Sequence, residues 1–318
     1  MADTEAILVG TVGQGILASR DDGDTWARVG IGQGMHSDAI IRCLTPDRAQ
    51  SGAIFAGSDR GLYRSDDVGI TWSLLDTAMN GKAVWVLSVD PADPTRLYAG
   101  TGTPNPAGIY RSTDGGQRWE QRPMEVAKDC PAVGVPRFTG IAIDPTDTRR
   151  IWAGLEVDGM RSSTDGGESW SAASDQIPNP DFHSVLVTAG PPKTVFGVVN
   201  NEVWLSRDDG ENWRPVGMRT VFPYQYPRTI VARSDDPKTV YVCIGDTTPG
   251  RIGTIMRSRD AGDTWEALTF PEQPNSAMWT VTMHPENPDH MLAATRYGYL
   301  YRSNDGGDTW TKLWREFS

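Results

Sequence analysis

The sequence has few cysteines and no long apolar runs. Its three cysteines, Cys43, Cys130 and Cys243, are widely scattered and show none of the short spacings of metal-binding motifs. We interpret them as small buried apolar residues, which fits a reducing compartment. We expect no cofactor and no metal-binding residues. A metal is the poorly supported alternative, because HSD at His36 and DFH at Asp181 each place a His two residues from an Asp, whereas zinc sites usually show a tighter His or Cys cluster. No stretch reaches the roughly 20 apolar residues that a transmembrane helix requires, so we expect no association with a membrane.

Basic residues are also in deficit. Lysine and arginine number 30 against 41 aspartate and glutamate residues, and the net charge is -11. Such a chain repels phosphate backbones, so nucleic acid is not an expected partner. The first residues, MADTEAILVG, are acidic where an export signal is basic, which favours a cytoplasmic location. A Gly-rich phosphate loop before a helix and a nucleophile elbow are both missing, which argues against nucleotide and serine hydrolases.

An eight-residue pattern is abundant instead. Its copies begin 43 to 52 residues apart, and each has Ser, Asp, Gly and Trp at positions one, three, five and eight. A period of this length is typical of propeller blades or helical arrays. The seven copies start at Ser19, Ser65, Ser112, Ser163, Ser206, Ser258 and Ser303.

These residue types suit a turn between two strands. A short Asp side chain can accept backbone N–H bonds, Gly tolerates positive φ, and Trp can pack beneath the turn. A catalytic acid is needed once, whereas a corner is needed in every blade. We therefore interpret the repeated acids and serines as architecture.

The pattern resembles the Asp box, also called the BNR repeat, which is known from sialidases, xyloglucanases, sortilin and a photosystem II assembly factor. The resemblance covers essentially the whole chain and implies a β-propeller. It includes both enzymes and binding proteins, so it does not decide between catalysis and binding. The arginine triad and RIP-type motif of sialidases are not matched well, since VPRFTG at Val135 is the nearest segment. Xyloglucanases of this family use two facing propellers, and here there is one.

Short alternating runs around each box predict four strands per repeat. We expect an all-β fold in which residues 1–318 form a single domain, a seven-bladed β-propeller with an Asp box between the third and fourth strands of every blade. Only five residues precede the run AILVGT, which matches a second strand. We therefore expect blade 1 to contain three strands.

Loops at the end opposite the boxes are predicted to carry the site. Alignment of the blades on their first turns gives one equivalent first-strand position per blade, and the residues there differ greatly in chemistry. A packing position would hold similar small or branched residues, so this variety favours a recognition surface, although aromatic residues plugging the channel are the alternative. The aligned residues are Ile40, Trp85, Thr139, His183, Arg228 and Trp279.

Neighbouring loops add acids, arginines and aromatic residues to the same predicted rim, and convergent polar groups on an aromatic concavity favour a binding or active site. The predicted catalytic residues are His183, Glu156, Asp59 and His36. The predicted substrate-binding residues are Trp85, Trp279, Arg228, Arg137, Phe138, Tyr226, Arg60, Arg296, Tyr297 and Asp246.

Three classes of function fit this set. A glycosidase needs two carboxylates and aromatic surfaces for sugar rings. A lyase acting on a small anion would use arginines as a clamp and a histidine for proton transfer. Our main hypothesis is an enzyme, or an enzyme-like binder, that acts on a small anionic or carbohydrate-like ligand. The alternative is a platform for a protein partner without turnover.

Overall fold

The structure is a computed structural model that describes residues 6–131 and 133–314. The chain divides into two compact units, Met1–Ser171 and Ala172–Ser318, which we describe separately. In both units every sheet is an antiparallel meander in which strands adjacent in the sequence are paired. We call the strands of each blade A to D in chain order, and blade 1 begins at strand B.

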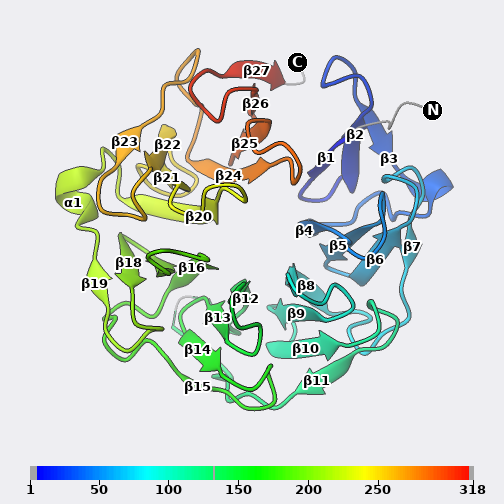
Figure 1. Ribbon diagram of the computed structural model, residues 1–318. Coiled ribbons are helices and arrows are strands. Elements are labelled where there is room, and N and C mark those ends of the chain that lie inside the picture. Colours follow the sequence, from blue (N-terminus) through cyan, green and yellow to red (C-terminus); the bar gives the residue numbers. More distant parts are fainter. Residues whose placement is uncertain (1–5, 132, 315–318) are drawn as a thin grey trace. The chain divides into compact units, whose positions relative to one another are not determined.

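The first unit contains four sheets, coloured blue to green in Figure 1. A short 3-10 helix, η1 (Ile31–Gln33), follows blade 1. The strands are β1 (Ile7–Gly10), β2 (Ile16–Ser19) and β3 (Ala27–Val29) in blade 1; β4 (Ile41–Pro46), β5 (Ile54–Ser58), β6 (Gly61–Ser65) and β7 (Ser73–Leu74) in blade 2; β8 (Ala83–Val89), β9 (Leu97–Gly102), β10 (Gly108–Ser112) and β11 (Glu120–Arg122) in blade 3; and β12 (Phe138–Ile143), β13 (Ile151–Leu155), β14 (Gly159–Ser163) and β15 (Ser171–Ala172) in blade 4.

The second unit contains three four-stranded sheets and one short helix, α1 (Met218–Val221). Its strands are β16 (Phe182–Val187), β17 (Val195–Val199), β18 (Glu202–Ser206) and β19 (Arg214–Pro215) in blade 5; β20 (Tyr226–Ala232), β21 (Val240–Gly245), β22 (Gly253–Ser258) and β23 (Glu266–Ala267) in blade 6; and β24 (Met278–Met283), β25 (Met291–Thr295), β26 (Leu300–Ser303) and β27 (Thr311–Trp314) in blade 7.

Each Asp box lies between strands C and D and is held by the same hydrogen bonds. The serine hydroxyl donates to the aspartate carboxylate at 2.7–2.9 Å in all seven boxes. The glycine N–H at position five donates to the serine oxygen at 2.8–2.9 Å. Because these bonds recur in every blade, the boxes are structural corners, and the predicted fold class is confirmed: seven propeller blades, with three strands in blade 1.

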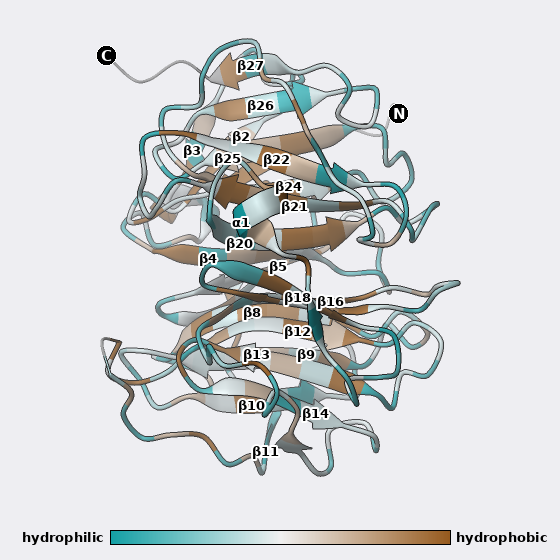
Figure 2. Cartoon of the chain, turned by 90° about the vertical axis from the view of Figure 1, so that its left-hand side faces the viewer, coloured by the Kyte–Doolittle hydropathy of each residue, from teal (hydrophilic) through white to brown (hydrophobic). Residues whose placement is uncertain are grey.

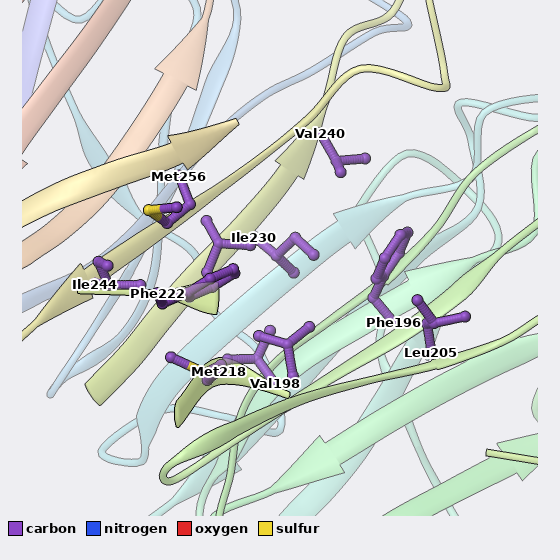
Figure 3. Packing of buried hydrophobic residues seen from close by; sticks show 11 residues of the cluster. Phe196, Val198, Leu205, Met218, Phe222, Ile230, Val240, Ile244 and Met256 are labelled. Carbon is purple, nitrogen blue, oxygen red and sulfur yellow. The ribbon is translucent and has the colours of Figure 1, made fainter. Parts of the chain in front are cut away.

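Apolar side chains pack between neighbouring sheets. Strands are largely hydrophobic in Figure 2, whereas the loops are mostly hydrophilic. In the second unit, one cluster joins blades 5 and 6 and includes Phe196, Phe222 and Ile230 (Figure 3). The helix α1 contributes the fully buried Met218 to this cluster. Neighbouring blades thus share a core, and their strand A residues are held in fixed positions.

Candidate functional site

A β-bulge interrupts strand A in each of the six four-stranded blades. One residue, or two in blade 6, is left out of the pairing with strand B. Bulges often lie near active sites because they re-aim a side chain. The bulged residues are Arg42, Trp85, Thr139, His183, Arg228 with Thr229, and Trp279.

Five of these bulged residues match the aligned positions predicted from the sequence, but the prediction for blade 2 was wrong. The pairing there skips Arg42, whereas Ile40 lies two residues earlier. The sequence did contain a signal, because Arg42 is the charged residue in the apolar run Ala39–Leu44. The structure thereby adds an arginine to the candidate site.

In the first unit, Trp85 lies beside two arginines. The guanidinium carbons of Arg42 and Arg137 lie 3.9 and 4.4 Å from the centroid of its ring. Because β4 and β12 both pack against β8, the two cations come from blades on either side of Trp85. The indole N–H donates to the carbonyl of Thr103 at 3.1 Å, which fixes the ring. Cation–π contacts of this kind are stabilising, and more so when they are desolvated.

The buried Glu156 carboxylate pairs with Arg137. The backbone N–H of Glu156 also donates to the Arg137 carbonyl at 2.9 Å. Of the predicted acids, Glu156 is thus already engaged by an arginine that contacts Trp85. The arrangement shows a carboxylate paired with an arginine that also contacts a Trp ring.

The other predicted residues of the first unit have local partners. Asp59 accepts the backbone N–H of Ile40 at 2.9 Å. Arg60 forms an ion pair with Asp38 at 2.8 Å. The Nδ1 atom of the exposed His36 lies 2.5 Å from the hydroxyl oxygen of the buried Tyr63.

Phe138 has no exposed surface and packs in the core of blade 4, so we leave it out of the proposed site.

In the second unit, Trp279 repeats the arrangement around Trp85. The guanidinium carbons of Arg228 and Arg296 lie 4.4 and 4.9 Å from the Trp279 ring centroid. Arg228 comes from the bulge of β20, and the neighbouring Thr229 hydroxyl donates to the Trp279 carbonyl at 2.8 Å. The Trp279 side chain is half-buried. The partly exposed Trp279 ring therefore contacts two cations.

Arg296 occupies in blade 7 the ladder position that Glu156 occupies in blade 4. Each is the first residue after strand B. The N–H of Arg296 donates to the Ala277 carbonyl, and the N–H of Glu156 donates to the Arg137 carbonyl. Both carbonyls belong to the residue two positions before the bulge of strand A. Arg296 is exposed, and no carboxylate among residues 6–131 and 133–314 lies within ion-pair distance of its guanidinium. The adjacent Tyr297 is 58% exposed. This end of blade 7 presents a cation and two aromatic rings to solvent.

His183 is enclosed between blades 5 and 6. Its side chain is 2% exposed, and its Nδ1 atom lies 2.7 Å from the Pro227 carbonyl oxygen. Its Nε2 atom lies 3.5 Å from Asp181, and its ring centroid is 5.0 Å from that of the buried Tyr226. These contacts suit packing between strands, so we leave His183 and Tyr226 out of the proposed binding set.

Asp246 lies in the exposed loop after β21. Its carboxylate accepts the backbone N–H groups of Thr247 and Arg251 at 3.0 and 2.9 Å. Partial burial acts to raise its pKa, but these hydrogen bonds outweigh it, so the pKa lies below the usual value. Asp246 therefore stays ionised and shapes its own loop.

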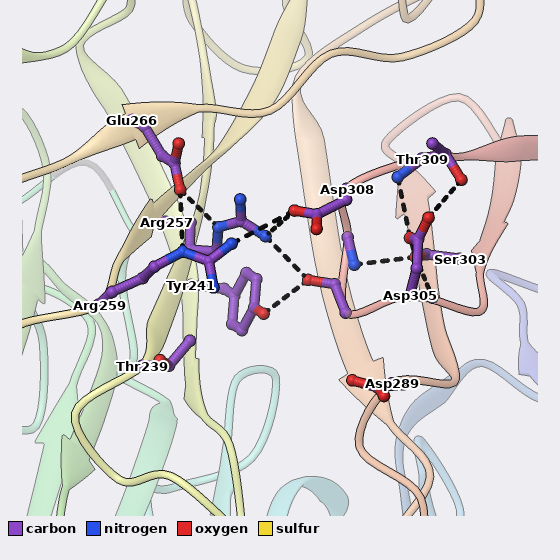
Figure 4. Close-up of polar contacts among 12 residues, drawn as sticks. Thr239, Tyr241, Arg257, Arg259, Glu266, Asp289, Ser303, Asp305, Asp308 and Thr309 are labelled. Atoms are coloured by element: carbon purple, nitrogen blue, oxygen red, sulfur yellow. Dashed lines mark hydrogen bonds and ion pairs between the residues drawn. The ribbon is translucent and has the colours of Figure 1, made fainter.

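A polar cavity of about 280 Å³ lies at the box end of blades 6 and 7. Figure 4 shows that Arg257 and Arg259 are bound to acids, and that Arg257 also binds a backbone carbonyl. Arg257 pairs with Glu266 and Asp308 at 2.8 and 2.7 Å, and Arg233 pairs with Asp289 at 2.9 Å. Because these cations are neutralised internally, we interpret the cavity as part of the contact between blades.

The described part of the chain holds no group of three or more His, Cys, Asp or Glu residues arranged for a metal. It also has no helix with the length and apolarity to cross a membrane. The three cysteines are free, and burial raises the pKa of the Cys43 thiol to about 11. Trp85 lies in the first unit while His183 and Trp279 lie in the second, so their convergence on one rim stays a prediction.

Seven blades, each closed by an Asp box, define the class as a β-propeller. The sortilin family model, Sortilin-Vps10 (sortilin, neurotensin receptor 3), matches residues 201–318. The sequence is 29% identical to the xyloglucanase Xgh74A of Acetivibrio thermocellus over 268 residues, which is 80% of this chain and 28% of that enzyme. It is 27% identical to a xyloglucanase of Hypocrea jecorina over 266 residues, 69% of this chain and 31% of that enzyme. The chain is an Asp-box β-propeller protein, and it spans less than a third of the length of these xyloglucanases.

Solved structures show the same fold. An ancestral GH74 enzyme superposes with a TM-score of 0.67 at 19% identity, covering 87% of this chain and 39% of the enzyme. YCF48 bound to D1 peptide superposes with a TM-score of 0.60 at 17% identity, covering 97% of this chain and 83% of YCF48. The fold is therefore shared by an enzyme and by a protein with a bound peptide.

Proposed function

We propose that this protein is a carbohydrate-recognising propeller that binds a carboxylate-bearing sugar at Trp279, Arg228 and Arg296. The observation that carries the proposal is the contrast between the two Arg–Trp arrangements. At Trp85 the adjacent Arg137 holds the Glu156 carboxylate. At Trp279 the exposed Arg296 has no carboxylate partner among the described residues. A ligand carboxylate would supply there the charge that Glu156 supplies at Trp85.

The chemistry of the three side chains supports this ligand class. A guanidinium offers paired N–H donors whose spacing matches a carboxylate. The half-buried Trp279 and the exposed Tyr297 offer apolar surface for the carbon-bound hydrogens of a sugar. The similarity to xyloglucanases over 80% of the chain supports a carbohydrate.

The contacts of the predicted acids do not support hydrolysis at this site. A glycosidase needs two carboxylates, roughly 5 to 10 Å apart. Glu156 is engaged by Arg137, and Asp59 accepts a backbone N–H. We therefore assign sugar binding, and not turnover, to the residues around Trp279.

The test compares an oligogalacturonate with its methyl ester, which keeps the rings and removes the charge. Isothermal titration calorimetry on the intact chain should show binding of the acid at least tenfold tighter than of the ester. Arg296→Ala should weaken binding of the acid about tenfold, since a charge-assisted hydrogen bond contributes about 1.5–3 kcal/mol. Arg219→Ala, at an exposed position of helix α1, is the matched control and should bind like the wild type. Equal affinity for acid and ester would refute the proposal.

Peptide binding is the second candidate, favoured by chain length. YCF48 with its D1 peptide matches this chain over most of both molecules, whereas the chain covers only a small part of the xyloglucanases. A peptide's terminal carboxylate would suit the same two arginines. A panel of free-acid and amidated peptides distinguishes this candidate, because it predicts tight peptide binding and no binding of the oligogalacturonate.

A further inference from the structure

Among residues 6–131 and 133–314, no strand pairs with the edge of blade 1 where the other six blades carry strand A. Its sheet contains β1, β2 and β3, and β1 corresponds to strand B. None of the four residues of β1 is buried, whereas every residue is buried in four of the six equivalent strands, β9, β13, β17 and β21. The β1 sequence, ILVG, is as apolar as those strands. An apolar strand therefore lies partly exposed at a sheet edge.

The backbone of this edge is available for pairing. β1 pairs with β2 from Ile7 to Gly10, and in such a ladder every second residue directs its N–H and C=O to the opposite edge. Within the described residues, Ile7–Gly10 make no backbone hydrogen bond on that edge. Pairing with a neighbour resumes only at Thr11, whose carbonyl accepts the N–H of Ile41 at 2.9 Å. The open edge thus has a defined length of about one short strand.

We propose that β1 is a docking edge for an extended segment of a partner polypeptide, which adds to blade 1 as an antiparallel fourth strand. The six existing A strands define the chemistry of that segment. Each pairs antiparallel with its strand B, and buried apolar residues recur along it, as in β16 (FHSVLV) and β8 (AVWVLSV). The partner is therefore a strand of about five residues with apolar side chains at alternate positions.

A partner segment fits better than a second copy of this chain. In the other six blades no strand in the described part of the chain pairs with the outer edge of strand A, so each of these sheets ends at strand A. A second copy would bring its own β1 with β2 and β3 attached and continue the sheet. The exposed Val12, 65% accessible next to β1, adds apolar surface at the end of the edge. The proposal is independent of the sugar site, which lies in the second unit.

The experiment adds a synthetic peptide that copies β16 and its flanking residues to the intact protein. Hydrogen–deuterium exchange is read at Ile7–Gly10, with the melting temperature as a second measurement. Two control peptides each carry N-methyl groups on alternate amides. In the inward-methylated peptide these amides would face β1. In the outward-methylated peptide they would face away from β1. The unmodified peptide and the outward-methylated peptide should each slow exchange at Ile7–Gly10 at least tenfold and raise the melting temperature. The inward-methylated peptide should do neither.

Protection by both methylated peptides alike, or by none of the three, would overturn the proposal. To separate weak affinity from the absence of a docking edge, the β8–β9 segment Ala83–Arg96 is fused in front of Ala6. The fused strand should protect Ile7–Gly10, whereas the same fusion with Leu87→Pro in the added copy should not. Equal exchange in the two fusions refutes docking at this edge. Protection that grows with protein concentration without peptide, together with a dimer in sedimentation, would show that the occupant is a second copy and would also refute the partner segment.

Discussion

The hydroxyl of Tyr241 in strand B of blade 6 donates a hydrogen bond to the carbonyl of Gly306 in the Asp box of blade 7, at 2.8 Å. Arg257 donates to the same carbonyl at 3.1 Å (Figure 4). The first unit repeats the pattern, because Tyr98 and Arg111 both donate to the Gly166 carbonyl at 2.9 Å. The boxes therefore close their own hairpins and also connect neighbouring blades.

Tyr241→Phe tests this connection. It removes one of two donors to a buried carbonyl and keeps the ring, so we expect a loss of about 1 kcal/mol of unfolding free energy. Tyr98→Phe should lose a similar amount in the first unit. Tyr297→Phe is the control, because this exposed side chain makes no hydrogen bond among the described residues, and its stability should stay unchanged. Urea unfolding measures all three, and equal stability of Tyr241→Phe and wild type would contradict the interpretation.

The fourth position of each box requires a left-handed backbone. It has φ between 57° and 73° in all seven boxes, and Val68 takes this conformation at 57°. A β-branched residue is strained there by about 1–2 kcal/mol, whereas Gly115 occupies the same position in blade 3 without strain. We expect Val68→Gly to raise the unfolding free energy by about 1 kcal/mol, since part of the gain is offset by the entropy of glycine.

The reverse change, Gly115→Val, is the matched control. A Cβ atom at Gly115 would meet no other atom within 4 Å, so only the backbone conformation is altered. It should lower stability by about the amount that Val68→Gly gains. If both variants had the stability of the wild type in thermal unfolding, the left-handed position would not be strained.

The box aspartates should control acid stability. Hydrogen bonds from the side chains and backbone of Ser169, together with the Ser163 hydroxyl, lower the pKa of Asp165 from 3.8 to about 2. A depressed pKa contributes stability that is present above the unfolded-state value and is lost as the pH falls through the folded-state value. The contribution of Asp165 should therefore be complete above about pH 4 and disappear near pH 2.

Asp165→Asn isolates this contribution. The variant should be less stable than the wild type at pH 7, and the difference should shrink between pH 4 and pH 2, where the wild-type carboxylate becomes protonated. Asp208→Asn in the second unit should behave alike, because hydrogen bonds from Asn212 and Ser206 lower the pKa of Asp208 to about 2. Urea unfolding at half-unit steps of pH provides the curves. A difference that stayed constant down to pH 2 would argue against the linkage.

The sequence predicted what depends on local pattern. The boxes follow from four residue types at fixed spacing, and the three strands expected for blade 1 are those that its described residues form. A bulge adds a residue to one strand of a pair, and its position depends on the pairing between strands. Aligning the blades by their turns does not account for this extra residue. In blade 2 the alignment therefore gave Ile40 in place of Arg42. The same long-range pairing buries Phe138, which a loop position does not reveal.

The partners of the predicted acids could also not be predicted from the sequence. Glu156 and Arg137 were both predicted for one rim, but their mutual pairing depends on the ladder between β12 and β13, which brings the first residue after one strand beside the residue before the other. A list of charged loop residues does not show which of them neutralise one another. The two Trp arrangements differ in this respect, because Arg137 beside Trp85 is paired with Glu156, whereas Arg296 beside Trp279 has no carboxylate partner among the described residues.

If Glu156 occupies the place of a ligand carboxylate, its removal should create a site that small carboxylates fill. Glu156→Ala leaves the partly buried Arg137 without its partner, which should cost about 3 kcal/mol of unfolding free energy. Acetate should then restore part of the melting temperature of the variant, relative to chloride at the same ionic strength, and leave the wild type unaffected. Glu156→Gln, which fills the volume with a neutral amide, should lose less stability and respond less to acetate. If acetate and chloride gave the same melting temperature for Glu156→Ala, the Arg137–Trp85 pair would not bind carboxylates, and the analogy that supports the site at Trp279 would fail with it.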